Sequence, residues 1–183
     1  MTELVRTLEE QKKEFKKGKL LATPIAGVIA WLIIGIGGMF LPLTGKVLLL
    51  FFATGCIVYL GMFVSKFTGE NFLDKKRPKN TFDNLFFFTV GQSLLVYSIA
   101  IPFFLVDYSS LPLTVGILTG LMWLPLTWII DHWVGAFHAI VRTVIVLVLW
   151  YLVPEYRFVV IPFAIVVVYI ITITIIMNRK IVD

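Results

Sequence analysis

Long apolar segments constrain this chain more than any other feature of its sequence. An apolar run of about 18 or more residues is long enough to cross the roughly 30 Å hydrocarbon layer of a bilayer as an α-helix. Six such runs follow one another, with expected bounds 20–41, 47–64, 85–106, 111–130, 133–152 and 158–177. The sequence therefore predicts an all-α fold, a polytopic transmembrane helix bundle with about six spans.

The composition leaves no room for a separate soluble domain. Hydrophobic residues make up 59% of the 183 residues and charged residues only 15%, whereas a soluble domain is about half apolar and a quarter charged. We expect a basic amphipathic helix over residues 1–19, a six-helix domain over 20–177 and a tail over 178–183. The net charge of +5 does not indicate nucleic acid, because the basic residues flank apolar spans, where orientation signals belong.

The basic residues are distributed unevenly between the two ends of the expected spans. In a six-span arrangement, thirteen of the sixteen Lys and Arg residues fall on one side, and only Lys46 and Arg157 fall on the other. Cytoplasmic loops carry an excess of Lys and Arg. The sequence therefore predicts that both the N- and C-termini, and the loop from Ser65 to Asn84, are cytoplasmic.

The first 19 residues have the pattern of an amphipathic helix. Thr7 and Glu10 have the spacing of a capping box, and an apolar stripe ends at Phe15. Five lysines cluster behind that stripe: Lys12, Lys13, Lys16, Lys17 and Lys19. Two interpretations stay open: the helix lies in the headgroup layer with its lysines toward anionic lipid, or it is solvated and only supplies positive charge.

Small residues and the single cysteine bear on packing. Gly27, Trp31, Gly35 and Met39 lie along one stripe of the first span, and small residues let neighbouring helices approach closely in a membrane. Cys56 is the only cysteine and lies inside an apolar span. It cannot form an intramolecular disulfide, and we interpret it as a packing residue.

The run from Asp131 to Arg142 holds the candidate functional residues. If helical geometry continues through it, Asp131, Gly135, His138 and Arg142 share one face. Arg142 lies near the middle of the fifth span, where a charged side chain costs about 2.5–3.5 kcal/mol on insertion scales. A partner or water must offset that cost, and the interiors of the six expected spans contain no carboxylate.

Neutral polar residues on the third span are the expected partners. Thr89, Ser93 and Tyr97 follow one another at helical spacing, with Gln92 beside them. Because Gln92 and Ser93 lie at about the depth of Arg142, we expect the third and fifth spans to face each other through them. Three threonines on other spans are weaker candidates: Thr54, Thr119 and Thr127.

Two interpretations of Arg142 follow. In the functional one, it lines a water-filled cavity and binds an anionic group, since guanidinium presents a planar fork of donors, while His138 carries protons or acts as a second ligand. In the structural one, Arg142 donates to Gln92, Tyr97 or backbone carbonyls and fixes helix packing.

Metal and cofactor chemistry are not expected. His132 is turned by roughly 100° from its neighbours Asp131 and His138 on a helix, and the sequence contains no HExxH or CxxC spacing. No serine or cysteine nucleophile stands in a recognisable motif, so an enzyme is not the leading hypothesis.

In its size, its basic N-terminal helix and its six compact spans, the chain resembles small bacterial membrane proteins of families whose function is unknown. The resemblance covers the whole chain and implies a multi-pass protein of the bacterial plasma membrane, but no activity and no residue role.

Three functional hypotheses result. The first is a small transporter or channel-like protein, a homo-oligomer such as a homodimer, which binds a small anionic ligand at Arg142 and His138 in a proton-linked manner. The second is a membrane enzyme that acts on a lipid or other amphiphile, with Asp131, His132 or His138 as base. The third is a non-catalytic accessory or assembly protein.

Overall fold

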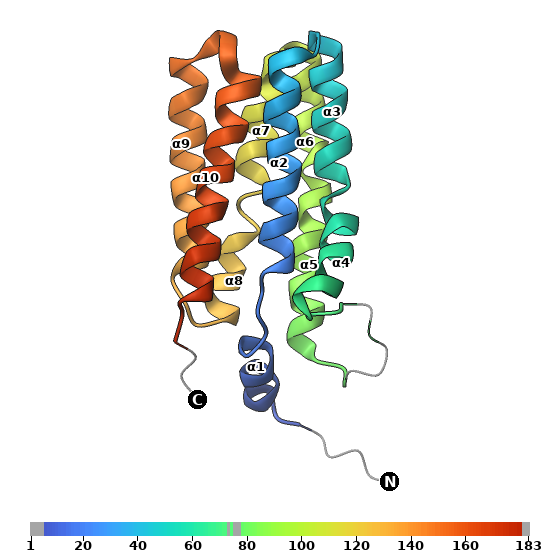
Figure 1. The fold of residues 1–183 in the computed structure, drawn as a ribbon, viewed down its shortest axis with the longest axis vertical. Helices are drawn as coiled ribbons and strands as arrows, with labels where there is room; N and C mark the ends of the chain where they lie inside the picture. Colours follow the sequence, from blue (N-terminus) through green and yellow to red (C-terminus); the bar gives the residue numbers. More distant parts are fainter. Residues whose placement is uncertain (1–5, 73, 75–77, 181–183) are drawn as a thin grey trace.

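The computed structural model describes residues 6–72, 74 and 78–180, and the helices run along the long axis of one bundle (Figure 1). The α-helices of the described residues are α1 (Leu8–Lys16), α2 (Ala22–Phe40), α3 (Leu43–Gly55), α4 (Ile57–Thr68), α5 (Thr81–Leu95), α6 (Tyr97–Val106), α7 (Leu111–Leu118), α8 (Trp123–Ile129), α9 (Val134–Leu152) and α10 (Arg157–Met177). Two short 3-10 helices, η1 (Tyr108–Ser110) and η2 (Pro154–Tyr156), precede α7 and α10. The prediction of an all-α fold is confirmed for these residues.

The described helices include enough apolar length for a multi-pass protein. Five segments are long and apolar enough to cross a membrane: Ala22–Phe40, Thr81–Val106, Tyr108–Ile129, Val134–Leu152 and Pro154–Met177. The helices α3 and α4 make a sixth only if the bent pair counts as one span, because their axes differ by 50°. The chain is therefore a helical membrane protein with five to six spans, and its orientation stays a prediction.

Three of the expected spans are not continuous helices, and the third expected span, 85–106, is interrupted only at Val96, between α5 and α6. The second expected span breaks at Cys56, two residues after Thr54, whose hydroxyl donates to the carbonyl of Leu50 at 2.6 Å. A hydroxyl that bonds the carbonyl four residues back weakens the helical ladder and bends the helix. The fourth breaks over residues 119–122, between α7 and α8. Neither of these last two breaks shows in a pattern of hydrophobicity, since the residues around both are apolar.

The helices α2 and α10 pack closely along the small-residue stripe. A Cβ atom at Gly27 would collide with the ring of Tyr169, and one at Gly38 would collide with the carbonyl of Phe158. Trp31 is fully buried between these glycines, whereas Met39 is exposed. The predicted close approach of a helix is confirmed, and that helix is α10.

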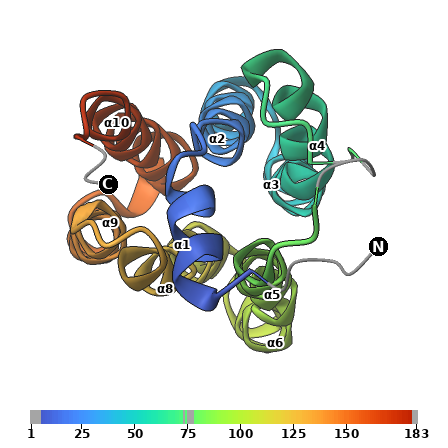
Figure 2. The same cartoon turned by 90° about the horizontal axis from the view of Figure 1, so that it is seen from below.

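The short helix α1 lies across one end of the bundle (Figure 2). The predicted capping box is present, with Thr7 accepting from the Glu10 backbone and the Glu10 side chain accepting from Thr7. Phe15 is buried against Phe82 and Phe86 of α5. The helix thus docks on the protein through its apolar face. Residues 1–5 and the basic residues 75–77 lie outside the described part of the chain.

Candidate functional site

The run from Asp131 to Arg142 is divided between a turn and a helix. Helix α8 ends at Ile129 and α9 begins at Val134, so the expected tight helical hairpin is confirmed. Asp131 adopts a left-handed conformation with φ of 48°, which ends helical geometry, so the expectation that it shares a face with Arg142 is wrong. His138 and Arg142 do lie together on the buried face of α9.

Arg142 is completely buried and holds neighbouring helices together. Its Nε donates to the carbonyl of Gly116 at 2.7 Å, and one terminal nitrogen donates to the hydroxyl of Thr119 at 2.8 Å. The other terminal nitrogen donates to the hydroxyl of Tyr169 at 3.1 Å. The guanidinium carbon also lies 5.2 Å from the ring centre of Trp31, within cation–π range. The partners come from α2, α7, the turn after α7, and α10.

The break after α7 explains why a carbonyl is available to Arg142. The Gly120 N–H donates to the Ile117 carbonyl at 2.8 Å, three residues back, instead of the Gly116 carbonyl four residues back. Nε of Arg142 therefore replaces the backbone N–H of Gly120 as the donor to the Gly116 carbonyl. A Cβ atom at Gly120 would lie 2.9 Å from Cδ of Arg142, so the glycine provides the space. Non-helical backbone at membrane depth persists only where the protein satisfies it.

His138 is fixed as a neutral ring by its partners. Its Nδ1 lies 2.8 Å from the hydroxyl of Thr172, which itself donates to the Val168 carbonyl at 2.8 Å. The Thr172 hydroxyl must therefore accept from His138, which places the imidazole proton on Nδ1. Nε2 then accepts from Arg142 at 3.5 Å. The imidazole also stacks on Trp123, with ring centres 4.3 Å apart.

The predicted pairing of the third and fifth spans is wrong. Gln92 is exposed on α5, Thr89 donates to the Phe86 carbonyl of its own helix, and Tyr97 shares a 2.5 Å hydrogen bond with Thr54. The side chain of Ser93 lies outside what the structure describes. Matched depth was a necessary condition for contact with Arg142, but helix order around the bundle decides contact, and it places α7 and α10 beside α9.

Three adjoining pockets lie between the end of the bundle that carries α1 and the arginine network, and all three share Phe86. The outer pocket has a volume of about 560 Å³ and is lined by residues of α1, of α5 and of the segments at 17–20, 69–72 and 74. The two inner cavities have volumes of about 20 and 40 Å³. The larger of them, the innermost, is lined by apolar side chains and by five residues that carry a hydroxyl: Thr23, Thr54, Tyr97, Thr119 and Tyr169.

The innermost cavity meets the arginine network at two hydroxyls. Thr119 and Tyr169 both line it and both accept from Arg142. Thr119 uses its own proton on the Val115 carbonyl at 2.6 Å. The Tyr169 oxygen accepts from the guanidinium, so its O–H can point at a molecule in the cavity. Arg142 therefore acts on the cavity through Tyr169 and does not line it.

Asp131 and His132 belong to a different cluster, at the end of the bundle. Asp131 forms ion pairs with Lys12 at 2.7 Å and Lys16 at 3.1 Å, both on α1. The hydrogen bond from Lys12 lowers the pKa of the Asp131 carboxyl. Nδ1 of His132 accepts from the Val134 N–H at the start of α9, and burial, together with the charge of Arg179, lowers the pKa of His132.

A comparison with known protein families covers almost the whole chain, including both of these clusters. A family of unknown function, DUF7010, matches residues 8–179, which run from the start of α1 to beyond the end of α10. The chain belongs to the DUF7010 family. No curated protein and no solved structure matches it.

In this DUF7010 member, the partners that sequence reasoning missed are Tyr169, Thr172 and the Gly116 carbonyl. Tyr169 and Thr172 are polar residues inside an Ile- and Val-rich run, three positions apart on one face of α10, and that contrast was a usable signal. The Gly116 carbonyl gave none, because its availability depends on a helix break. Among the described residues, no group of three or more His, Cys, Asp and Glu side chains could hold a metal ion.

Proposed function

We propose that this protein is a small transporter or channel-like membrane protein that binds an anionic group at the inner end of its cavity. The observation that carries the proposal is the position of Thr119 and Tyr169 between the innermost cavity and Arg142. Two hydroxyls line the cavity and at the same time hold a guanidinium that is completely buried. The hydrogen-bonded partners of Arg142 in the described part of the chain include no carboxylate, so its charge has no counter-ion there.

An uncompensated cation favours an anion nearby. In a medium of low dielectric constant the attraction between unlike charges is much stronger than in water. The hydroxyl of Tyr169 is polarised by the guanidinium that donates to it, which makes its proton a better donor toward the cavity. The ligand contact thus falls to Tyr169, whereas the sequence alone favoured direct contact with Arg142.

His138 serves in this proposal as a positioning residue. Its Nε2 faces Arg142 and its Nδ1 binds Thr172, so a second proton would place two cations against each other. We therefore give the His138–Arg142 pair no role in carrying protons.

The end of the bundle that carries α1 holds charges of both signs. The described basic residues of α1 and of the linker that follows it stand at this end (Figure 1). Two lysines and four carboxylates line the outer pocket: Lys17, Lys19, Glu14, Glu70, Asp74 and Asp83. The proposal therefore rests on the inner cavity and not on the charge of its entrance.

One observation favours the accessory or assembly protein as a second candidate. Arg142 is completely buried and each of its three nitrogens has a protein acceptor, as expected of a residue that only fixes helix packing. The enzyme hypothesis gains no comparable support, since Asp131 is engaged by two lysines and His132 by the start of α9.

Anion flux from liposomes tests the proposal. Purified protein is reconstituted into vesicles loaded with nitrate or formate, and efflux is recorded for the wild type, Tyr169→Phe and the matched control Tyr59→Phe, which alters an exposed residue of α4. We expect wild-type and control vesicles to release the anion and Tyr169→Phe vesicles to release it about tenfold more slowly, the effect of one lost hydrogen bond to a charged group. Wild-type efflux equal to that of empty vesicles would leave the accessory role standing.

A further inference from the structure

We infer that the two adjoining inner cavities together hold a small, monovalent, weakly hydrated anion, bound by the O–H of Tyr169 in one cavity and the indole N–H of Trp123 in the other. This inference rests on the proposed function and names its ligand class. Nitrate and thiocyanate are members of that class, whereas formate is an anion of similar size that is more strongly hydrated. Three observations carry it: the size of the cavity, a buried donor without an acceptor, and a carboxylate at the neck.

The inner cavities are small. The innermost has a volume of about 40 Å³ and the adjoining one about 20 Å³, and they share Thr23, Phe86 and Met122. A single water molecule needs roughly 10–15 Å³ on the same measure. The space therefore accepts a few water-sized groups, which matches a three- or four-atom anion and excludes the tail of a lipid.

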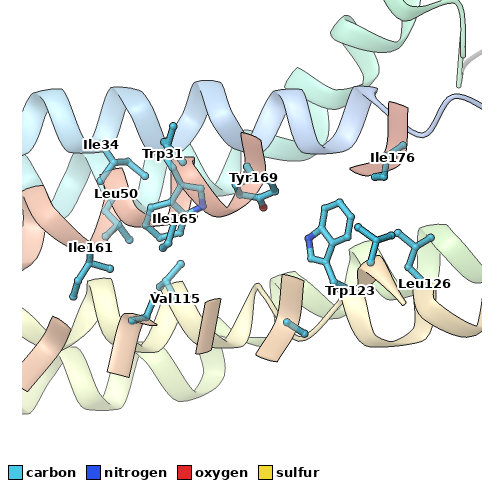
Figure 3. Close-up of a cluster of buried hydrophobic side chains, with 14 of the residues drawn as sticks. Trp31, Ile34, Leu50, Val115, Trp123, Leu126, Ile161, Ile165, Tyr169 and Ile176 are labelled. Atoms are coloured by element: carbon cyan, nitrogen blue, oxygen red, sulfur yellow. The ribbon is translucent and has the colours of Figure 1, made fainter. Parts of the chain in front are cut away.

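Trp123 offers a donor that nothing in the described protein uses. Its side chain is only 3% exposed, it lines the cavity of about 20 Å³, and its Nε1 has no hydrogen-bond partner. Buried polar groups almost always have a hydrogen-bond partner, so the unpaired indole N–H of Trp123 favours a bound molecule beside it. The rings of Trp123 and Tyr169 are 6.0 Å apart, and the indole nitrogen and the hydroxyl oxygen point toward each other (Figure 3). Both donors therefore reach one small acceptor.

The neck of the cavity selects by charge. Glu70 lines both the outer pocket and the cavity beside Trp123, and its Oε1 accepts from the backbone N–H groups of Leu21 and Ala22 at 2.9 and 2.8 Å. Repulsion by this carboxylate grows in proportion to the charge of the passing anion. The remaining walls are mostly apolar, so they offer few hydrogen bonds to replace the water that a strongly hydrated ion loses on entry. Both effects favour a monovalent, weakly hydrated anion.

Binding measured on the full chain in detergent tests the ligand class. Melting temperature is recorded against increasing sodium nitrate, thiocyanate or formate, at constant ionic strength, and against sulfate and octanoate. Ligands that bind only the folded state raise the melting temperature as they saturate. The variants are Trp123→Phe and Trp150→Phe. Trp150 is the matched control, because its Nε1 is also buried without a partner but it stacks on Arg157, away from the cavity.

We expect nitrate and thiocyanate to protect the wild type and Trp150→Phe at equal concentrations, and formate to protect them less. The midpoint concentration should rise about tenfold in Trp123→Phe, the loss of one charge-assisted hydrogen bond. If Trp123→Phe does not fold, fluorescence replaces it: iodide quenches indole on contact, and we expect stronger quenching in the wild type than in Tyr169→Phe. Equal quenching in these two proteins would overturn the site.

The remaining outcomes separate the two proposals. Protection by octanoate that is lost in Tyr169→Phe, without protection by the small anions, overturns the ligand class and leaves the anion site of the proposed function intact. Protection that is the same in Trp123→Phe and Trp150→Phe is a general salt effect and overturns the role of Trp123. No response to any anion overturns both the ligand class and the anion site.

Discussion

Asp131 and Arg142 are eleven residues apart in the sequence and have their charges neutralised in opposite ways. The Asp131 side chain is 49% exposed and meets two lysines of α1. Arg142 is fully buried and meets two hydroxyls, a backbone carbonyl, a histidine and aromatic faces. At the end of the bundle charge is matched by charge; in its centre a cation is held by oriented dipoles.

The difference determines what each cluster responds to. Ions in solution weaken the pairs of Asp131, because an ion pair that is open to solvent is partly screened by salt. Dipoles packed around Arg142 are not reached by those ions. We therefore expect the two clusters to separate in mutational cost and in dependence on salt and pH.

The largest effect is expected for Arg142→Met. The change leaves the Gly116 carbonyl and the hydroxyl of Thr119 without their donor, and a buried group without its partner costs about 1–3 kcal/mol. We expect the free energy of unfolding to fall by about 3 kcal/mol, measured as a lower melting temperature in detergent.

Arg157→Met is the matched control for that variant. Arg157 also donates to a backbone carbonyl, that of Trp150, and to a hydroxyl, that of Ser109, but it lies at the partly exposed start of α10. A loss in Arg157→Met as large as that in Arg142→Met would mean that burial in the centre of the bundle gives Arg142 no special weight.

An intermediate effect is expected for Gly120→Ala. The added Cβ would lie 2.9 Å from Cδ of Arg142 and 3.1 Å from the Ile117 carbonyl, so the arginine must move away from Gly116. We expect a melting temperature between those of Arg142→Met and the wild type.

Gly91→Ala controls for the general effect of alanine in a helix. A Cβ there meets nothing within 4 Å, and alanine stabilises a helix by up to about 1 kcal/mol relative to glycine. We therefore expect Gly91→Ala to melt at or above the wild-type temperature. The explanation through Arg142 fails if Gly120→Ala does the same.

The smallest effect is expected for Asp131→Asn, and it should depend on salt and pH. The pKa of the Asp131 carboxyl is lowered from 3.8, chiefly by its hydrogen bond with Lys12, so its stabilisation is present above that value and is lost as the pH falls through the folded-state pKa. The difference in melting temperature between wild type and Asp131→Asn should be constant from pH 7 to about 5 and vanish in stronger acid.

His132 does not disturb that comparison, because it is present in both proteins. Its pKa is lowered from 6.5, first by burial, so both proteins lose stability together as the pH falls below that value. High salt should also reduce the Asp131 difference while leaving the cost of Arg142→Met unchanged. An Asp131 difference that is equally large at low and high salt would contradict the screening argument.

The sequence contained the all-α fold and the position of most helices. Long apolar runs report span length directly, so the expected bounds 133–152 and 158–177 differ from α9 and α10 by one residue at most. The importance of Arg142 also followed from the sequence, because a charge at that depth needs a partner. A backbone carbonyl and, as a weaker candidate, Thr119 were among the expected acceptors, although no particular carbonyl was named, and both kinds of acceptor are found. Gln92 and Tyr97 were also expected and are not partners of Arg142.

The identity of its partners did not follow, for two physical reasons. Depth along a span can be counted, but the order of helices around a bundle arises from packing between spans, here through Gly27 and Tyr169. The helix break at 119–122 depends on Arg142 itself, since the arginine and the freed Gly116 carbonyl satisfy each other. A feature that two distant segments create together has no signature in either segment alone.

The contact between Arg142 and the end of α7 has a consequence for how the chain enters the bilayer during synthesis. Presented alone to the insertion machinery, α9 carries an arginine at its centre that opposes partitioning by about 2.5–3.5 kcal/mol. Its acceptors, the Gly116 carbonyl and the Thr119 hydroxyl, lie on the segment made just before it, and only the short turn at 130–133 separates α8 from α9. The nascent chain thus delivers the acceptors first, and the two segments partition into lipid as one hairpin.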